Sequence, residues 1–363
     1  MSSCLVYWST FTLIFSRIQG FQNREMCNAV ACRHRVSLDV ASPSILGKDF
    51  IPQLLERKKW EVRELESQYA DPLDPVQLRL SYVAEKSSLK LTRALRLFAL
   101  GDENRRVSVV GDLKRLSPTA LNMPRTVGSF VDAGRRADEL FDWGVNVLMV
   151  NTDETGWGGN KNDLDSVAAA VKARVERRKT ASENPELAPN VKTGVYASGP
   201  MHTAILCKDI IIHPLQIAEA VERGADGVLL IASVCGGRLP DLMDACTIMG
   251  TECVVECHTP NECAYAIEQG AMSLMLNCWD RSDGAWHADQ AEAVRRMVPD
   301  HVVTIAAGGM GSSDQARRLS DCGFDGVCLG RALVLHPDPP QLVRNIRDFQ
   351  ASPLLAGVNG NAI

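Results

Sequence analysis

The sequence contains no Cys-x-x-Cys pair, although twelve of its 363 residues are cysteine. Cysteines that are scattered singly through apolar runs favour reduced, mostly buried thiols over a disulfide framework or a metal site. The densest group is Cys253, Cys257, His258 and Cys263, but Cys253 and Cys257 fit alternate positions of a buried strand. We therefore expect no zinc at this group.

A strong excess of charge of one sign is also lacking. The chain has 39 Lys and Arg against 44 Asp and Glu, a formal net charge of −5. This balance gives no electrostatic reason to expect nucleic acid or an anionic membrane as a partner, so an anionic ligand would need a local basic site. With 45% apolar and 23% charged residues, the composition is that of a globular protein with a large core and excludes disordered and fibrous classes.

The apolar stretch at the amino terminus is too short to span a bilayer. Residues Cys4 to Phe15 are uncharged and mostly apolar, which suits a signal peptide, and the chain from Gly20-Phe21 to Ser44 carries Arg and Ser with few acidic residues, as transit peptides do. We expect residues 1–45 to be a two-part presequence that delivers the protein to the stroma of a plastid, with no membrane anchor in the mature form. The alternative is a secretory signal alone, against which the unpaired cysteines argue.

A glycine-rich dinucleotide turn is absent after the first strand-like run, which ends in Lys114-Arg115-Leu116-Ser117-Pro118. Eight short β-branched or apolar runs alternate with segments that carry apolar residues at helical spacing, a pattern typical of βα units. Eight units predict an α/β fold, a closed (β/α)8 TIM barrel with parallel strands, because a doubly wound sheet needs fewer strands. The expected strands are 107–113, 145–150, 204–207, 227–231, 253–257, 273–276, 302–306 and 326–329.

The domain organisation follows from this count. We expect an N-terminal helical extension over residues 46–105, where Ile51, Leu54, Leu55, Trp60 and Val62 lie on a helical repeat, and the barrel over 106–352. The connection at about 172–200 is long and charged. A surface insertion is the default interpretation of such a segment, and an active-site lid is the alternative.

Active sites of such barrels lie at the carboxyl ends of the strands. Polar residues close several of the expected strands: Lys114, Lys208, Asp209, Glu256, His258 and Asn277. Lys208 and Glu256 lie two strands apart on one rim and form a workable acid and base pair. The alternative is that Lys208 only forms an ion pair with Asp209 or Asp112.

Glycines follow the last two expected strands. Gly308 and Gly309 come after the seventh, and Gly330 with Arg331 after the eighth. Glycine lets backbone N–H groups approach an anion, and barrels often bind phosphate at these two loops. The alternative is that these glycines only permit tight turns.

One segment carries a specific resemblance. The run from Ile205 to Ile217, ILCKDIIIHPLQI, closely resembles the third βα unit of indole-3-glycerol phosphate synthases, and Gly224 to Ile231 continues the match. Weaker matches occur in order along the chain at Lys58, Lys114 with Ser117, Asn151 to Asp153 with Trp157, Glu256 with His258, Asn277, Gly309 and Gly330. The resemblance covers roughly residues 48 to 350.

The resemblance implies a lyase of tryptophan biosynthesis that closes the ring of 1-(2-carboxyphenylamino)-1-deoxyribulose 5-phosphate, without metal or organic cofactor. It places Lys208 as general acid and Glu256 as base, with Lys114 assisting proton transfer and contacting the substrate's anionic groups. It gives substrate-binding positions to Asp112, Ser117, Ile210, Asn277, Gly308, Gly309, Gly330 and Arg331. The partner is then a phosphorylated small molecule, and association with other enzymes of the same pathway is a further expectation.

The chain departs from the family within the pocket. Asp112 stands for a glutamate, Ile210 for a phenylalanine, Trp279 for an arginine and Arg331 for a small hydroxylated residue. After the seventh strand, the family's glutamate-serine-glycine is Ala307-Gly308-Gly309. The lost carboxylate would cost ~10²- to 10⁴-fold in rate. A catalytically impaired plastid paralogue with a binding or structural role is therefore the alternative, whereas phosphoribosylanthranilate isomerase would not explain the third unit.

Overall fold

The computed structural model describes residues 50–96, 107–117, 128–183, 203–279, 287 and 289–348. The proposed presequence, residues 1–45, lies outside these ranges. The described helices and strands belong to one compact unit, residues 45–363.

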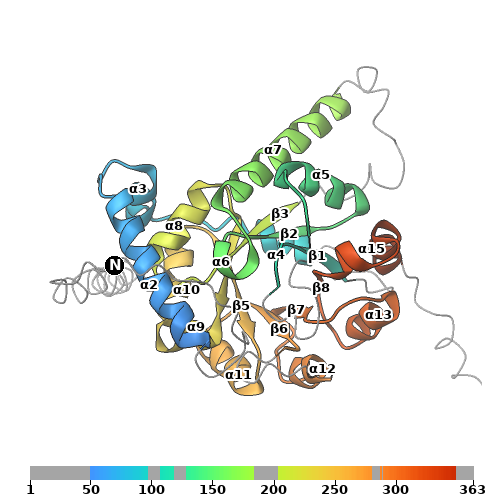
Figure 1. Cartoon of the computed structure of the whole chain (residues 1–363). Helices are drawn as coiled ribbons and strands as arrows, with labels where there is room; N and C mark the ends of the chain where they lie inside the picture. The colour runs from blue at the N-terminus through green and yellow to red at the C-terminus, as the bar shows by residue number, and fades with distance from the viewer. Residues whose placement is uncertain are drawn as a thin grey trace, which may run out of the picture. The chain divides into compact units, whose positions relative to one another are not determined.

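The eight expected strands are all present and form a closed parallel barrel in the order β1 to β8 (Figure 1). Each strand pairs with the next along the chain, and β1 pairs with β8 to close the sheet. The predicted (β/α)8 barrel is confirmed, and the predicted strand bounds differ from the observed ones by at most two residues. The strands are β1 (Ser108–Leu113), β2 (Val147–Asn151), β3 (Ala204–Lys208), β4 (Gly227–Ile231), β5 (Glu252–Cys257), β6 (Ser273–Asn277), β7 (Val303–Ala307) and β8 (Gly326–Leu329).

The pleat of the strands separates an inner from an outer core. Side chains alternate along a strand, so Val110, Leu206, Val254 and Met275 pack inside the barrel. Their chain neighbours, among them Val109, pack outward against the helices. The residue two places beyond each inner residue also points inward, at the carboxyl end of its strand.

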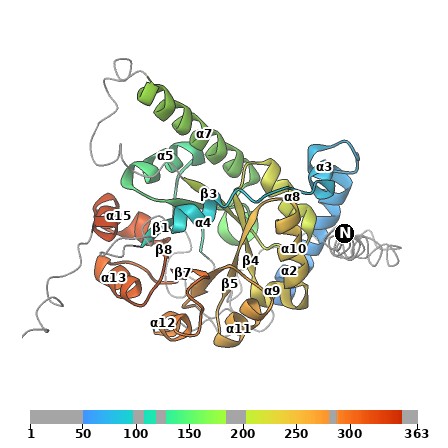
Figure 2. The same cartoon turned by 180° about the vertical axis from the view of Figure 1, so that it is seen from behind.

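Helices surround this barrel in both views (Figures 1 and 2). They are α5 (Ala133–Trp143), α6 (Glu154–Trp157), α7 (Lys161–Glu183), α8 (Pro214–Glu222), α9 (Ala232–Cys235), the 3-10 turn η3 (Gly236–Arg238), α10 (Leu239–Ile248), α11 (Pro260–Glu268), α12 (Gln290–Arg295), α13 (Ser313–Asp321), α14 (Ala332–Leu335) and α15 (Pro339–Asp348). Side-chain caps define where several begin: Ser312 accepts the backbone N–H of Gln315 at α13, and Thr259 that of Glu262 at α11.

Among the described residues before β1, three helices lie in the range expected for the helical extension: α2 (Phe50–Gln68), α3 (Pro75–Ser81) and α4 (Lys90–Leu95). Leu91 and Leu95 of α4 belong to the inner core. The backbone N–H groups of Leu91 and Thr92 donate to the carboxylate of Glu252, at the start of β5, at 2.7 and 3.0 Å. This helix therefore closes the amino-terminal end of the barrel.

The expected insertion at about 172–200 is helical in its described part. Residues 172–183 are the last turns of α7, a helix of 23 residues that projects beyond the ring of helices (Figure 1). Residues 184–202 lie outside the described residues.

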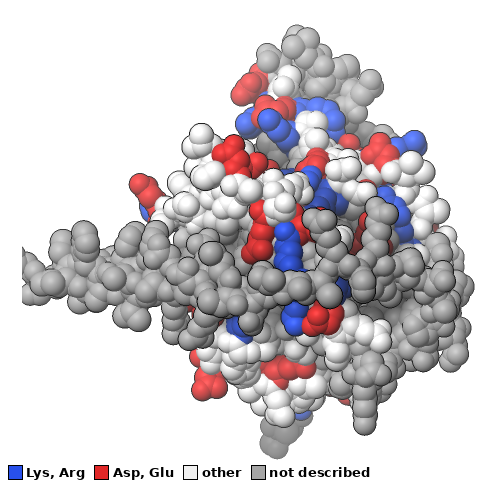
Figure 3. Space-filling model, turned by 60° about the vertical axis from the view of Figure 1, so that its left-hand side comes forward, with Lys and Arg blue, Asp and Glu red and all other residues white. Residues whose placement is uncertain are grey.

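Charges of both signs are interspersed over the coloured surface in Figure 3, as the overall balance predicts. Among the described residues, no helix is long and apolar enough to cross a membrane.

Candidate active site

The carboxyl ends of the strands bring five polar side chains to one rim of the barrel. Asp112, Asn151, Lys208, Glu256 and Asn277 each lie two positions beyond an inner-core residue of their strand. The thiol of Cys328, on β8, is buried close to four charged groups of this rim. Burial and the carboxylates of Asp112 and Glu256 raise the pKa of this thiol to about 12, and the ammonium groups of Lys208 and Lys114 oppose the rise. The rim therefore gathers the predicted acid and base around one space.

Asp112 lies between two lysines. Its Oδ2 is 2.5 Å from Lys114 Nζ and 3.4 Å from Lys208 Nζ, and its Oδ1 accepts a 2.7 Å hydrogen bond from Asn151 Nδ2. Burial opposes ionisation of Asp112, but the two ammonium groups outweigh it and hold its pKa below the usual value. Burial lowers the pKa of Lys114, and Asp112 offsets this only in part because Lys208 adds to it. The three groups carry one net positive charge.

Lys208 also faces an aromatic ring. Its Nζ lies 5.9 Å from the ring centroid of Trp157, a buried residue of α6. Trp157 and Asn151 were not assigned to the site from sequence. Both residues lie in the segment after the second strand that weakly resembles the family. That resemblance was the one sequence feature that could have pointed to them, because neither side chain is a typical acid, base or nucleophile.

Glu256 is fully buried and held by two neighbours. Asn277 Nδ2 donates to its Oε1 at 2.6 Å, and His258 Nε2 lies 3.3 Å from the same oxygen. Asn277 thus contacts the predicted base directly. His258 was predicted only to close the fifth strand, and the structure brings it into contact with Glu256.

The glycines after β7 and β8 lie beside these groups. Gly308 and Gly309 have φ of 87° and 82°, a left-handed conformation that favours glycine. A Cβ on Gly330 would lie 3.3 Å from both Asp112 Oδ2 and Lys114 Nζ. These positions are compatible with both interpretations of the glycines, a phosphate site and tight turns.

Arg331 reaches across from β8 to β1. Its Nη2 donates to Ser117 Oγ at 3.3 Å, and burial lowers the pKa of its guanidinium. The residue therefore adds a half-buried cation beside the turn after β8.

Two further residues, Asp209 and Ile210, follow β3 directly. Ile210 is buried with Leu54 and Val62 of α2, with Trp157 and with Ile231 of β4. Ile210 is 2% exposed and shares this cluster with Trp157, the ring that faces Lys208, and its place in the substrate site stays a prediction.

Asp209 does not pair with Lys208. Its Oδ1 lies 2.6 Å from Nζ of the buried Lys58, which also lies 2.8 Å from Asp153 Oδ2. Thr152 donates to Asp209 Oδ2 at 2.6 Å. Of the two ion pairs considered for Lys208, only the one with Asp112 is therefore formed.

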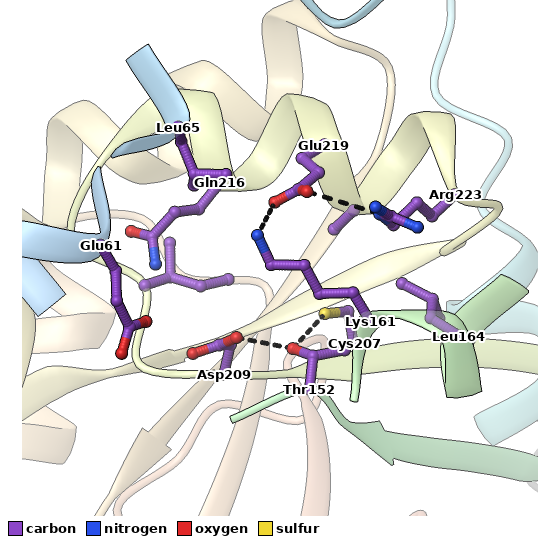
Figure 4. Close-up of a pocket in the computed structure, with 12 residues that line it drawn as sticks. Glu61, Leu65, Thr152, Lys161, Leu164, Cys207, Asp209, Gln216, Glu219 and Arg223 are labelled. Carbon is purple, nitrogen blue, oxygen red and sulfur yellow. Dashed lines mark hydrogen bonds and ion pairs between the residues drawn. The ribbon is translucent and has the colours of Figure 1, made fainter. Parts of the chain in front are cut away.

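A small cavity lies behind β3, outside the barrel wall, between α2, α7 and α8 (Figure 4). Its charged lining is internally paired, as with Lys161 and Glu219 at 2.7 Å. Burial raises the pKa of the Cys207 thiol in its lining to about 12, which disfavours the thiolate, the nucleophilic form. The chemistry therefore belongs to the rim and not to this cavity.

No group of three or more His, Cys, Asp and Glu side chains is arranged to hold a metal within the described part of the chain. The site offers instead two ammonium groups and two carboxylates. This set supports proton transfer on an anionic substrate.

A family model described as indole-3-glycerol phosphate synthase matches residues 51–346. The chain belongs to the indole-3-glycerol phosphate synthase family. The resemblance predicted from the third βα unit is thereby confirmed, and because the family consists of carboxy-lyases, so is the prediction of a carbon–carbon lyase.

Relatives of the same name share about a quarter of their residues with this chain. The indole-3-glycerol phosphate synthase of Syntrophobacter fumaroxidans is 27% identical over 301 residues, 82% of this chain and 97% of the relative. That of Mycobacterium avium is 27% identical over 241 residues, 66% of this chain and 76% of the relative. Among solved structures, 3-hexulose-6-phosphate synthase from Salmonella typhimurium matches with a TM-score of 0.45 at 16% identity, over 66% of this chain and 97% of that one.

Proposed function

We propose that this family member converts 1-(2-carboxyphenylamino)-1-deoxyribulose 5-phosphate to indole-3-glycerol phosphate, CO₂ and water in tryptophan biosynthesis. The observation that supports this most is the arrangement of Lys208 and Glu256, which both face the barrel interior at the carboxyl ends of β3 and β5. An ammonium group and a carboxylate on one rim can act on two ends of a single substrate.

The rim supplies a residue for each proton transfer of the reaction. Lys208 protonates the ketone oxygen of the substrate while the aromatic carbon that bears the carboxylate attacks the ketone carbon. A carbon–carbon bond forms, and CO₂ leaves as the ring regains aromaticity. Glu256 then removes the carbon-bound proton while Lys114, the second ammonium group of the rim, donates a proton to the new hydroxyl, which leaves as water.

Charge at the rim suits an anionic substrate. Asp112 neutralises only one of Lys114 and Lys208, so this part of the rim keeps a positive charge in a buried place where it attracts an anionic group strongly. Asn277 orients the substrate. The phosphate binds at the turns after β7 and β8, where Gly308, Gly309 and Gly330 supply backbone N–H groups and Arg331 and Ser117 supply side chains.

Ala307 favours a second candidate function, a catalytically impaired paralogue with a binding role. Its side chain ends β7 inside the barrel, 4% exposed and paired in register with Asn277. The family's carboxylate is therefore missing next to the residue that holds Glu256. Loss of one catalytic group lowers a rate without abolishing it.

The decisive experiment incubates the purified protein with the carboxyphenylamino-deoxyribulose phosphate and follows indole fluorescence. We expect turnover that falls ~10²- to 10⁴-fold in Lys208→Ala and in Glu256→Gln. Lys59→Ala, a variant of an exposed lysine of α2, is the matched control and should keep the wild-type rate. A wild-type signal no higher than that of Lys208→Ala would favour the impaired paralogue.

Delivery to a plastid belongs to the same proposal. It is supported by the apolar stretch from Cys4 to Phe15 and the Arg- and Ser-bearing chain that follows. Residues 1–45 fused to a fluorescent protein should direct it to the plastid of an alga with complex plastids. Fluorescence confined to the secretory route would contradict this.

A further inference from the structure

His258 lies between two carboxylates. Its Nε2 is 3.3 Å from Glu256 Oε1, and its Nδ1 is 3.5 Å from Oε2 of Glu262, in the first turn of α11. The same Glu262 oxygen accepts the backbone N–H of His258 at 2.8 Å. With only 2% of its surface exposed, the imidazole has one nitrogen within ion-pair distance of each carboxylate, although Nδ1 forms no hydrogen bond.

Hydrogen-bonding chemistry determines which form of the ring fits here. A neutral imidazole has one N–H donor and one lone pair, so one nitrogen would present its lone pair to a carboxylate oxygen. The doubly protonated ring turns an N–H, and no lone pair, toward each carboxylate. Two nearby anions also favour the cation over the neutral ring.

Two elements among the described residues place a charged group against the ring. They are β5, which carries Glu256, and α11, which carries Glu262. Gln290 of α12 donates its side-chain amide to the carbonyl oxygen of His258 and is uncharged. Cys257, on the outer side of β5, and Cys263, on α11, are buried thiols.

We propose that His258 is a positioning residue for Glu256: as an imidazolium it anchors Oε1 together with Asn277 and keeps this buried carboxylate ionised. The inference rests on the proposed function, in which Glu256 is the base. A carboxylate in a fully buried place would otherwise tend to take up a proton, and a protonated Glu256 accepts no proton from the substrate. Glu262 holds the cation from the outer side.

Two substitutions separate the charge of His258 from its hydrogen bond. His258→Gln keeps an amide donor for Glu256 but removes the charge, so we expect the acidic limb of the kcat profile to move about one unit to higher pH. The plateau at high pH should stay within about threefold of wild type. His258→Leu removes both, and its plateau should also fall ~10²-fold. Glu268→Gln, an exposed position of α11, is the control and should leave the profile unchanged.

An acidic limb at the wild-type pH in both variants would overturn the proposal. A separate measurement does not need turnover: ¹⁵N NMR of the His258 ring in the full chain should show both nitrogens protonated at pH 7. Glu256→Gln and Glu262→Gln should each lower the pH at which the ring loses its proton. A ring that is neutral at pH 7 overturns the inference, whereas absent indole formation by the wild type overturns only the proposed function.

Discussion

The side-chain amide of Asn277 donates a 2.6 Å hydrogen bond to Glu256 Oε1, while its oxygen accepts the backbone N–H of Trp279 at 3.1 Å. The two bonds assign the two ends of the amide and leave no freedom to exchange them. Asn277 therefore ties the predicted base on β5 to the chain that follows β6. Whatever displaces the oxygen of Asn277 also displaces Glu256.

Gly308 protects this arrangement. A Cβ at position 308 would lie 2.5 Å from Asn277 Oδ1 and 2.9 Å from the backbone nitrogen of Cys278, and the φ of Gly308 is 87°. We expect Gly308→Ser, which restores the family's residue, to lower rather than raise kcat, by ~10-fold or more if Glu256 moves by a fraction of an ångström. Steady-state kinetics and thermal unfolding measure the two effects.

Gly270→Ala is the matched control for this substitution. Gly270 has a φ of 91°, close to that of Gly308, but a Cβ there would meet nothing within 4 Å. Both variants bear the backbone cost, about 1 kcal/mol, and only Gly308→Ser bears the clash. Equal kcat in the two variants would mean that Gly308 does not guard Asn277.

Lys58 is expected to be essential for stability rather than for chemistry. Its ammonium is 3% exposed and lies within 2.8 Å of Asp153 and Asp209. Lys58→Met would leave two buried carboxylates without this cation, at a cost of ~3–5 kcal/mol in the free energy of unfolding. Denaturant unfolding measures this loss. Lys59→Met, one residue away and exposed, should show no measurable change.

The pH dependence of the free energy of unfolding distinguishes a contribution from the charges of Lys58 and Asp209 from a contribution of their packing. Lys58 has a raised pKa, because Asp209 and Asp153 outweigh its burial, so its contribution is present below about pH 10 and is lost as pH rises further. Asp209 has a lowered pKa, because Lys58 and hydrogen bonds outweigh its burial, so its contribution is lost as pH falls below about 4. The difference in the free energy of unfolding between wild type and Lys58→Met should therefore be constant from pH 5 to 9 and shrink in acid. A gap that does not shrink would point to lost packing.

The barrel could be predicted from sequence because its determinants are local. Each strand is a short apolar run, and period-two alternation alone places Lys208 two positions after Leu206 and Glu256 two positions after Val254 on the inner face. The rim assignment of both residues follows from this.

The contacts between rim residues could not be predicted in the same way. That Lys208 pairs with Asp112 while Asp209 pairs with Lys58 depends on how α2 packs against α8 and against the residues that follow β2 and β3, and the paired residues are up to 151 positions apart. The pairing of Asn277 with Glu256 likewise depends on barrel closure. The spacing of residues along the sequence does not indicate which of several similar carboxylates a distant lysine pairs with.

Asp112 offers a test of how the rim shares its charge. Burial lowers the pKa of Lys114, and Asp112 opposes that shift. Asp112→Asn removes the opposing carboxylate but keeps a side chain that can bond Asn151, so the pKa of Lys114 should fall further. We expect the alkaline limb of kcat/KM to move to lower pH by about one unit or more, and a pH–rate series measures it.

Asp112→Glu keeps the charge and restores the family's residue, so its alkaline limb should stay at the wild-type position even if its longer side chain changes kcat. If Asp112→Asn and Asp112→Glu shift the limb equally, the effect comes from displaced geometry and not from charge.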